Sequence, residues 1–72
     1  MAKKQLQYQK IEEYIIKQIK HGKVHRGDKL PSENELCAQF NVSRMTVNKA
    51  LTHLSDQEYI ERIPGKGSFV RG

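Results

Sequence analysis

Residues 31–54 read PSENELCAQFNVSRMTVNKALTHL, and the other elements of the chain can be placed around them. Ser32 followed by Glu35 is typical of a capping box, in which the hydroxyl accepts from a free backbone N–H while the carboxylate reaches back to the cap. Ser43 is a second N-cap candidate, and Asn41 tolerates the left-handed backbone conformation of a turn. The pattern predicts two short helices joined by about three residues, which is a helix-turn-helix.

The second of these helices has one apolar and one polar face at a period of 3.6 residues. The apolar residues, which we expect in the core, are Val47, Ala50, Leu51 and Leu54. The opposite face carries Met45, Asn48, Lys49 and Thr52, with Arg44 on the flank of the first turn. Such a face fits a helix that reads the DNA major groove and fits an ordinary solvated helix equally well. The capped helix that precedes it favours DNA.

The composition indicates one small domain with a polyanionic partner. The chain has 72 residues, a formal net charge of +5 and one cysteine. The positive charge fits nucleic acid, although acidic lipid would also attract it. No apolar run approaches the roughly 20 residues that cross a bilayer, so we expect no membrane partner. A single cysteine forms no internal disulfide, which suits a reducing cytoplasm, and Cys37 is expected to pack as a small hydrophobe.

The N-terminal part predicts a flexible arm over residues 1–7 and a first helix over residues 8–21. Tyr8, Ile11, Ile15 and Ile19 recur at spacings of three and four, which predicts one buried stripe. Gly22 is well placed to end this helix. We expect the helix to be a scaffold for the two that follow.

The C-terminal part predicts a β-hairpin. Two β-prone segments, residues 59–63 and 68–71, flank the turn residues Pro64-Gly65-Lys66-Gly67. Ile60 and Phe69 are expected to point inward, and residues 29–30 are expected to add one very short strand. The predicted fold is mainly α with a small β-hairpin: a winged helix-turn-helix of three helices plus a two- to three-stranded antiparallel wing.

The tip of the predicted wing combines flexibility with a positive charge. Gly65 and Gly67 let the backbone approach another surface, and Lys66 between them supplies a cation. This arrangement suits phosphate contact or entry into a minor groove. The alternative is a solvent-exposed turn in which the glycines serve only its shape.

Catalytic and metal chemistry are poorly supported. His21 and His25 are four residues apart, but Gly22 interrupts the helix between them and no further ligand completes a metal set. A Cys37–His53 pair is conceivable, but two single residues are weak grounds for catalysis. We therefore predict no enzyme activity, no metal and no cofactor.

Several separated motifs together resemble the N-terminal DNA-binding domain of GntR-family bacterial transcription regulators. They are LPSENEL at residues 30–36, NVSR at 41–44, Thr46-Val47, Ala50-Leu51 and GKGSFV at 65–70. The lead-in GDKLPSE at 27–33 and the GKGSFV ending look most like the HutC-type branch. The resemblance covers residues 8–70, nearly the whole chain.

The resemblance implies a metabolite-responsive regulator, usually a repressor, that binds a palindromic operator as a homodimer. In that family a larger C-terminal domain binds the small-molecule effector and drives dimerisation. We expect residues 8–70 to be the DNA-binding domain, residues 71–72 to begin an interdomain linker, and the effector domain to be absent here. A cytoplasmic, nucleoid-associated location follows from the same likeness.

The resemblance also implies roles for individual residues. Arg44 occupies the position of an arginine that contacts guanine, and Thr46 and Gly65 match positions near DNA. Asn34 and Asn48 stand where arginines are common, and Asn reads adenine through its N6 and N7 atoms or contacts phosphate. The predicted DNA-binding residues are Ser32, Asn34, Ser43, Arg44, Met45, Thr46, Asn48, Lys49, Gly65, Lys66 and Gly67.

Two further classes of function remain open from the sequence. The polar face of a winged helix also serves as a docking surface for another protein. A winged helix also binds RNA, although the deep, narrow major groove of an RNA duplex suits a reading helix poorly. The basic loops and the glycine-flanked cationic tip favour duplex DNA.

Overall fold

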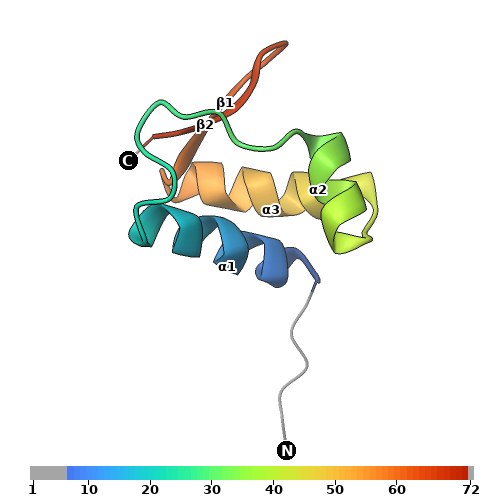
Figure 1. Ribbon diagram of the computed structural model, residues 1–72. Helices are drawn as coiled ribbons and strands as arrows, with labels where there is room; N and C mark the ends of the chain where they lie inside the picture. Colours follow the sequence, from blue (N-terminus) through green and yellow to red (C-terminus); the bar gives the residue numbers. More distant parts are fainter. Residues whose placement is uncertain (1–6, 72) are drawn as a thin grey trace, which may run out of the picture.

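The computed structural model describes residues 7–71, which form three helices followed by a two-stranded antiparallel sheet (Figure 1). The elements are α1 (Gln7–Lys20), α2 (Glu33–Phe40), α3 (Arg44–Asp56), β1 (Ile60–Ile63) and β2 (Gly67–Val70). This order confirms the predicted winged helix-turn-helix. The predicted arm lies outside the described residues except for Gln7, which is the first residue of α1. Gly72 also lies outside them.

The first helix begins and ends one residue earlier than predicted, which is within the usual uncertainty of helix ends. Gly22 follows it with a φ angle of 72°, so the chain turns away in the left-handed conformation that glycine adopts without strain. Ile11 and Ile15 are fully buried, and Tyr8 and Ile19 pack at the edge of the core. The helix is therefore the scaffold that its apolar stripe predicts.

Both motif helices begin at the predicted caps. The Ser32 hydroxyl accepts a hydrogen bond from the backbone N–H of Glu35 at 3.1 Å, and the Glu35 carboxylate accepts from the N–H of Ser32 at 2.8 Å. Ser43 accepts from the backbone N–H of Thr46 at 3.2 Å. Asn41 has a φ angle of 54° and donates its backbone N–H to the Cys37 carbonyl. These contacts satisfy donors that the first turn of a helix leaves free and turn the chain between α2 and α3.

The core lies where the three helices meet the sheet. Its buried apolar members are Ile11, Ile15, Leu30, Leu36, Val47, Ala50, Leu51, Leu54, Ile60 and Val70. Four of them are the predicted inward residues of α3. Cys37 packs against this cluster, as expected of a small hydrophobe. The remaining face of α3 is therefore left to solvent.

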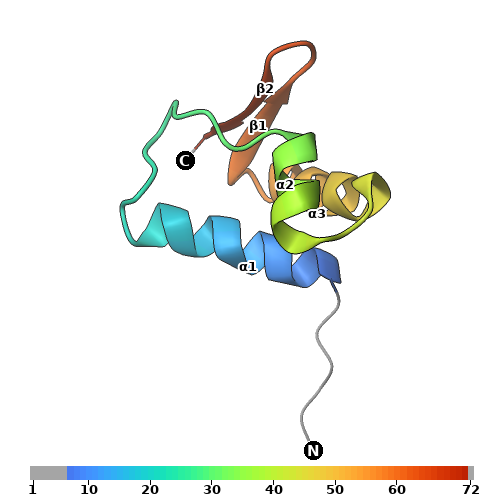
Figure 2. The ribbon, with the colours of Figure 1, turned by 45° about the vertical axis from the view of Figure 1, so that its right-hand side comes forward.

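The hairpin pairs Ile60 with Val70 and Ile63 with Gly67, and its turn projects beyond the helices (Figures 1 and 2). The expected third strand is present as one antiparallel bridge between Lys29 and Phe69. The backbone N–H of Leu30 also donates to the Ser68 carbonyl at 2.8 Å. The loop after α1 is thus tied to the outer edge of β2.

The prediction that Phe69 points inward is wrong. Residues directly opposite each other in an antiparallel pair share a face of the sheet, and Val70 lies opposite Ile60. Val70 and Ser68 are therefore buried, at 3% and 7% exposure, while Phe69 is half-buried on the other face. The prediction chose the larger side chain and thereby the wrong phase of the alternation.

Burial of the apolar face of α3 gives a stability prediction. Leu54→Ala removes a fully buried side chain and leaves a cavity, so the free energy of unfolding should fall by about 2–5 kcal/mol. Met45→Ala on the opposite face, where the side chain is 81% exposed, should change it by less than about 0.5 kcal/mol. Urea unfolding followed by circular dichroism measures both. Equal losses would show that α3 does not face inward as described.

Candidate nucleic-acid interface

The predicted reading face of α3 is exposed along the first two turns of the helix. Arg44, Met45, Asn48 and Lys49 are all exposed, and they lie opposite the buried aliphatic residues of the same helix. Thr46 is half-buried, and its hydroxyl lies 3.0 Å from that of Ser43. The helix therefore presents polar and apolar groups to an external partner without any change in its packing.

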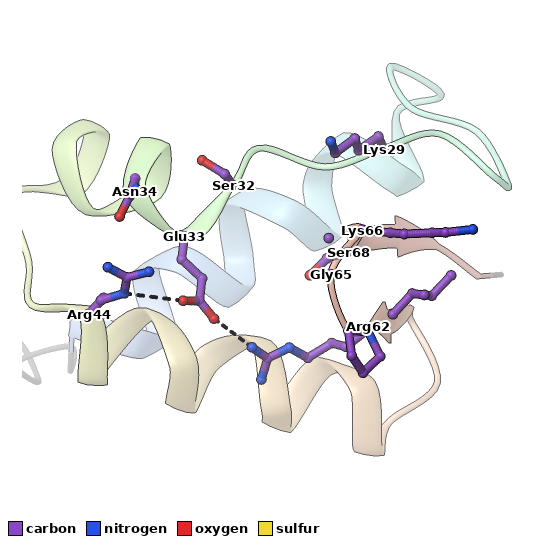
Figure 3. A pocket seen from close by; sticks show the side chains of 12 residues that line it. Lys29, Ser32, Glu33, Asn34, Arg44, Arg62, Gly65, Lys66 and Ser68 are labelled. Atoms are coloured by element: carbon purple, nitrogen blue, oxygen red, sulfur yellow. Dashed lines mark hydrogen bonds and ion pairs between the residues drawn. The ribbon is translucent and has the colours of Figure 1, made fainter.

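A groove of about 600 Å³ lies between the start of α2, the start of α3 and the hairpin (Figure 3). Six of the predicted binding residues line it: Ser32, Asn34, Arg44, Gly65, Lys66 and Gly67. The other five, which lie on or just before α3 and do not line the groove, are Ser43, Met45, Thr46, Asn48 and Lys49. The prediction thus covers two adjoining surfaces, the groove and the exposed side of the reading helix.

The lining of the groove is strongly basic. Its ionisable residues are Lys29, Arg44, Arg62 and Lys66, against one carboxylate, that of Glu33. Several cations facing one open groove attract a polyanion, and they contact phosphate oxygens well. The groove is thus positively charged where six of the predicted binding residues lie.

Glu33 links the two arginines of the groove. Its Oε1 lies 3.5 Å from Arg44 Nε, and its Oε2 accepts from Arg62 Nη2 at 2.7 Å. Figure 3 shows the carboxylate between the two guanidinium groups, one from α3 and the other from the hairpin. The carboxylate holds both arginines near the groove and offsets part of their charge.

Arg62 is one of three ionisable groove residues that the sequence reasoning missed, with Lys29 and Glu33. Besides Glu33, its Nη1 donates to Asn48 Oδ1 and to Thr52 Oγ1, both at 3.0 Å. A signal for it existed in the sequence. Arg62 is two residues after the inward-facing Ile60, so strand alternation puts a charged side chain on the face that meets the helices. Such a residue needs polar partners on those helices.

Lys49 has a partner within the domain. Its Nζ lies 4.5 Å from the centroid of the Tyr8 ring, in a cation–π contact between α3 and α1. Tyr8 in turn packs edge-on against His53, with 6.5 Å between the ring centroids. The ammonium group is therefore turned toward α1 and away from the groove that Arg44 lines.

The backbone conformation of the wing tip by itself favours glycine at two positions. Gly65 and Gly67 have φ angles of 77° and 121°, which other residues adopt only with strain. A Cβ atom on Gly67 would also come within 3.1 Å of Lys29 Cε. The shape of the turn is thus sufficient to require both glycines, and their contact with a partner stays a prediction.

Two histidines that the sequence analysis considered for metal binding or catalysis have carboxylate partners instead. The Nδ1 atom of His53 lies 3.0 Å from Glu12 Oε2, and His25 lies beside Asp28. Within residues 7–71, no group of three or more His, Cys, Asp or Glu side chains is arranged to hold a metal ion. In the same range no helix is both long and apolar enough to cross a bilayer.

The profile of the gntR family of bacterial regulatory proteins matches residues 7–70. The chain belongs to this family. It is the winged-helix DNA-binding domain of a GntR regulator, as the separated motifs predicted. The match includes all three helices and the whole hairpin.

Curated relatives give the same assignment. The uncharacterized HTH-type transcriptional regulator YurK of Bacillus subtilis is 45% identical over 64 residues, which are 89% of this chain and 26% of YurK. The histidine utilization repressor of Klebsiella aerogenes is 44% identical over 63 residues, 88% of this chain and 26% of the repressor. The second relative confirms the expected likeness to the HutC-type branch. The chain spans about a quarter of the length of these relatives.

Solved structures of DNA complexes have the same fold. The NTD of AraR in complex with a mutant ORR3 aligns with a TM-score of 0.92 at 38% identity, covering 96% of this chain and 99% of that one. The AraR DBD in complex with operator ORR3 aligns with a TM-score of 0.88 at 36% identity, covering 97% and 87%. The fold of this chain is thus the fold of the AraR domain in its complexes with an operator.

Glu33 gives a testable prediction about specificity. Glu33→Gln removes the negative charge that pairs with Arg44 and Arg62, which frees Arg44 and leaves Arg62 with only its bonds to Asn48 and Thr52. Both guanidinium groups then attract any phosphate more strongly. Affinity for random duplex DNA should rise, and the ratio of selected-site to random-site affinity should fall. Fluorescence anisotropy with both duplexes measures that ratio.

Glu61→Gln is the matched control for this prediction, because it removes the same charge from an exposed residue of β1 outside the groove. It should leave the ratio of affinities nearly unchanged. An unchanged ratio for Glu33→Gln as well would show that the carboxylate does not organise the two arginines for DNA.

Proposed function

We propose that this domain binds double-stranded operator DNA with α3 in the major groove and the hairpin tip at the adjacent minor groove. The observation that carries the proposal is the continuity of one surface, from the exposed face of α3 through the basic groove to the wing. The AraR domains, at 36–38% identity, were solved in complex with operators, which supports operator binding by this fold. The buried half of α3 fixes the orientation that this docking needs.

Individual roles follow from the chemistry of each side chain. Arg44 is proposed to contact guanine, since a guanidinium donates two hydrogen bonds to the O6 and N7 atoms of that base. Met45, which is 81% exposed, offers an apolar contact to a thymine methyl group. The starts of α2 and α3, at Ser32 and Ser43, direct positive dipole ends at phosphates. Lys66 contacts the backbone beside the minor groove.

We further propose that the intact regulator is a cytoplasmic repressor that acts as a homodimer. Two copies would occupy the halves of a palindromic operator, with centres about 34 Å or less apart along the duplex. The matched residues are about a quarter of the length of these relatives, and the additional length of the relatives fits a C-terminal effector-binding domain that drives dimerisation. Selection of bound sequences from a random duplex pool would show the inverted repeat and its spacing.

The proposed roles of Arg44 and Lys66 make separate predictions. Arg44→Ala should lower affinity for the selected site by about 10- to 100-fold and leave random-duplex affinity much less changed, because a base contact is lost. Lys66→Ala should weaken binding to both duplexes alike and reduce the slope of log K against log salt by about 1. Salt titrations with each duplex measure these effects. Equal loss on both duplexes for Arg44→Ala would contradict its assignment to base reading.

The two alternative classes of function predict different competition. A domain that docks on a protein would bind duplexes weakly and without sequence preference. A DNA-binding domain would bind its selected site tightly, with an affinity that falls steeply as salt rises. An RNA-binding domain would prefer an RNA duplex or hairpin of the same sequence. We expect duplex DNA to displace a labelled operator and duplex RNA to fail at equal concentration. Efficient displacement of the operator by duplex RNA would contradict the preference for DNA and favour an RNA-binding function.

A further inference from the structure

The amide oxygen of Asn48 is already occupied by two donors from within the domain. Asn48 Oδ1 accepts a hydrogen bond from Arg62 Nη1 at 3.0 Å. It accepts another from Thr52 Oγ1 at 3.3 Å. A carbonyl oxygen of a side-chain amide has two lone pairs, so these two bonds use its accepting capacity.

The orientation of the Asn48 amide follows from the chemistry of its partner. A guanidinium carries only donors, so the atom of Asn48 that faces Arg62 must be the oxygen and not the nitrogen. The NH₂ group then points away from Arg62, on an exposed side chain of the reading face. Toward a partner, Asn48 therefore offers donors alone.

Arg62 is held firmly enough to impose this orientation. Its Nη2 donates to Glu33 Oε2 at 2.7 Å, and its Nη1 bridges Asn48 and Thr52. The Arg62 side chain is only 30% exposed. Turning Arg62 outward would break a charge-assisted hydrogen bond to Glu33 as well as both bonds on α3.

The base preference of Asn48 changes with this orientation. To bind adenine with two hydrogen bonds, Asn must accept from N6 and donate to N7. An Asn whose oxygen is occupied meets the N6 amino group of adenine with its own N–H donors, which repel it. Guanine shows two acceptors, N7 and O6, at the same edge.

We propose that Arg62 is a specificity-determining residue, which occupies the oxygen of Asn48 and makes Asn48 select guanine over adenine in the major groove. The proposal rests on the proposed binding of operator DNA. The residue type alone suggests that Asn48 binds adenine by accepting one hydrogen bond and donating another. In the proposed contact Asn48 only donates, to the acceptors of guanine. Arg62 acts here through Asn48, without touching the base.

The first experiment locates the base pair that Asn48 reads. Sequences are selected from a random duplex pool with the wild-type domain and with Asn48→Ala. The position at which only the wild type shows a purine preference is assigned to Asn48, and the preferred purine there should be guanine. A selected motif that is identical for both proteins would overturn the proposal while leaving operator binding intact.

The second experiment tests the polarity of the contact. Affinities are measured for duplexes that carry guanine, adenine or purine (adenine without its N6 amine) at that position. The wild type should bind guanine about tenfold more tightly than adenine, and removal of the amine should not weaken binding. Arg62→Met removes one of the two donors to the Asn48 oxygen and leaves only the longer bond from Thr52. Affinity for the adenine duplex should then rise relative to the guanine duplex, and removal of the adenine amine should weaken binding.

Three control variants separate this effect from loss of charge or of folding. Arg71→Met removes the same charge from an exposed side chain outside the groove and should keep the wild-type order of bases. Arg62→Lys keeps the charge and can donate to Asn48, so it should retain the preference for guanine more fully than Arg62→Met. Asn48→Ala gives the effect of each modified base on the duplex itself. Circular dichroism verifies that each variant is folded.

The wild-type protein alone can overturn the proposal. If it binds adenine more tightly than guanine at that position and loses affinity when the amine is removed, the Asn48 oxygen is free on DNA and Arg62 does not control it. An unchanged order of bases in a folded Arg62→Met domain would overturn it too. A wild type that binds no duplex would instead refute the proposed function, so the two failures are distinct.

Discussion

The structure depends on the burial of one side of α3. Val47, Ala50, Leu51 and Leu54 are all at most 1% exposed, and they join α1, α2 and the hairpin in one core. Burying these residues also fixes the rotation of the helix about its axis, because side chains project in fixed directions from a helix. The exposed face is therefore set by the same packing that stabilises the domain. A chain of this size has little other apolar surface with which to orient a reading helix.

The polar network of the groove extends this constraint to the hairpin. Glu33 is the first residue of α2, so the Ser32 cap determines where its carboxylate lies. That carboxylate meets Arg62 from the hairpin and Arg44 from α3. One acidic side chain thereby links α2, α3 and the hairpin, in addition to their packing in the core. Because the groove has four cationic residues and one carboxylate, Glu33 positions the arginines while the groove remains basic.

The local features of the fold were predictable from the sequence, whereas the contacts between elements were only partly so. The caps at Ser32 and Ser43 and the apolar face of α3 have short-range causes, and the structure confirms them. The inward residue of β2 was misassigned because side-chain size does not reveal which residues pair across a hairpin. The partners of Arg62 come from two helices, so only the folded chain brings them together. The candidate binding residues themselves remain predictions, although six of the eleven line one groove.

The bridge between the loop after α1 and β2 has a mechanical consequence. The backbone N–H of Val70 donates to the Asp28 carbonyl at 2.9 Å, and that of Leu30 donates to the Ser68 carbonyl at 2.8 Å. Leu30 is only two residues before the cap of α2. A force applied at Val70 is therefore transmitted to the lead-in to α2 through backbone hydrogen bonds, in addition to the packing of Leu30 and Val70 in the core. A displacement of β2 is therefore coupled directly to the segment that leads into the helix-turn-helix.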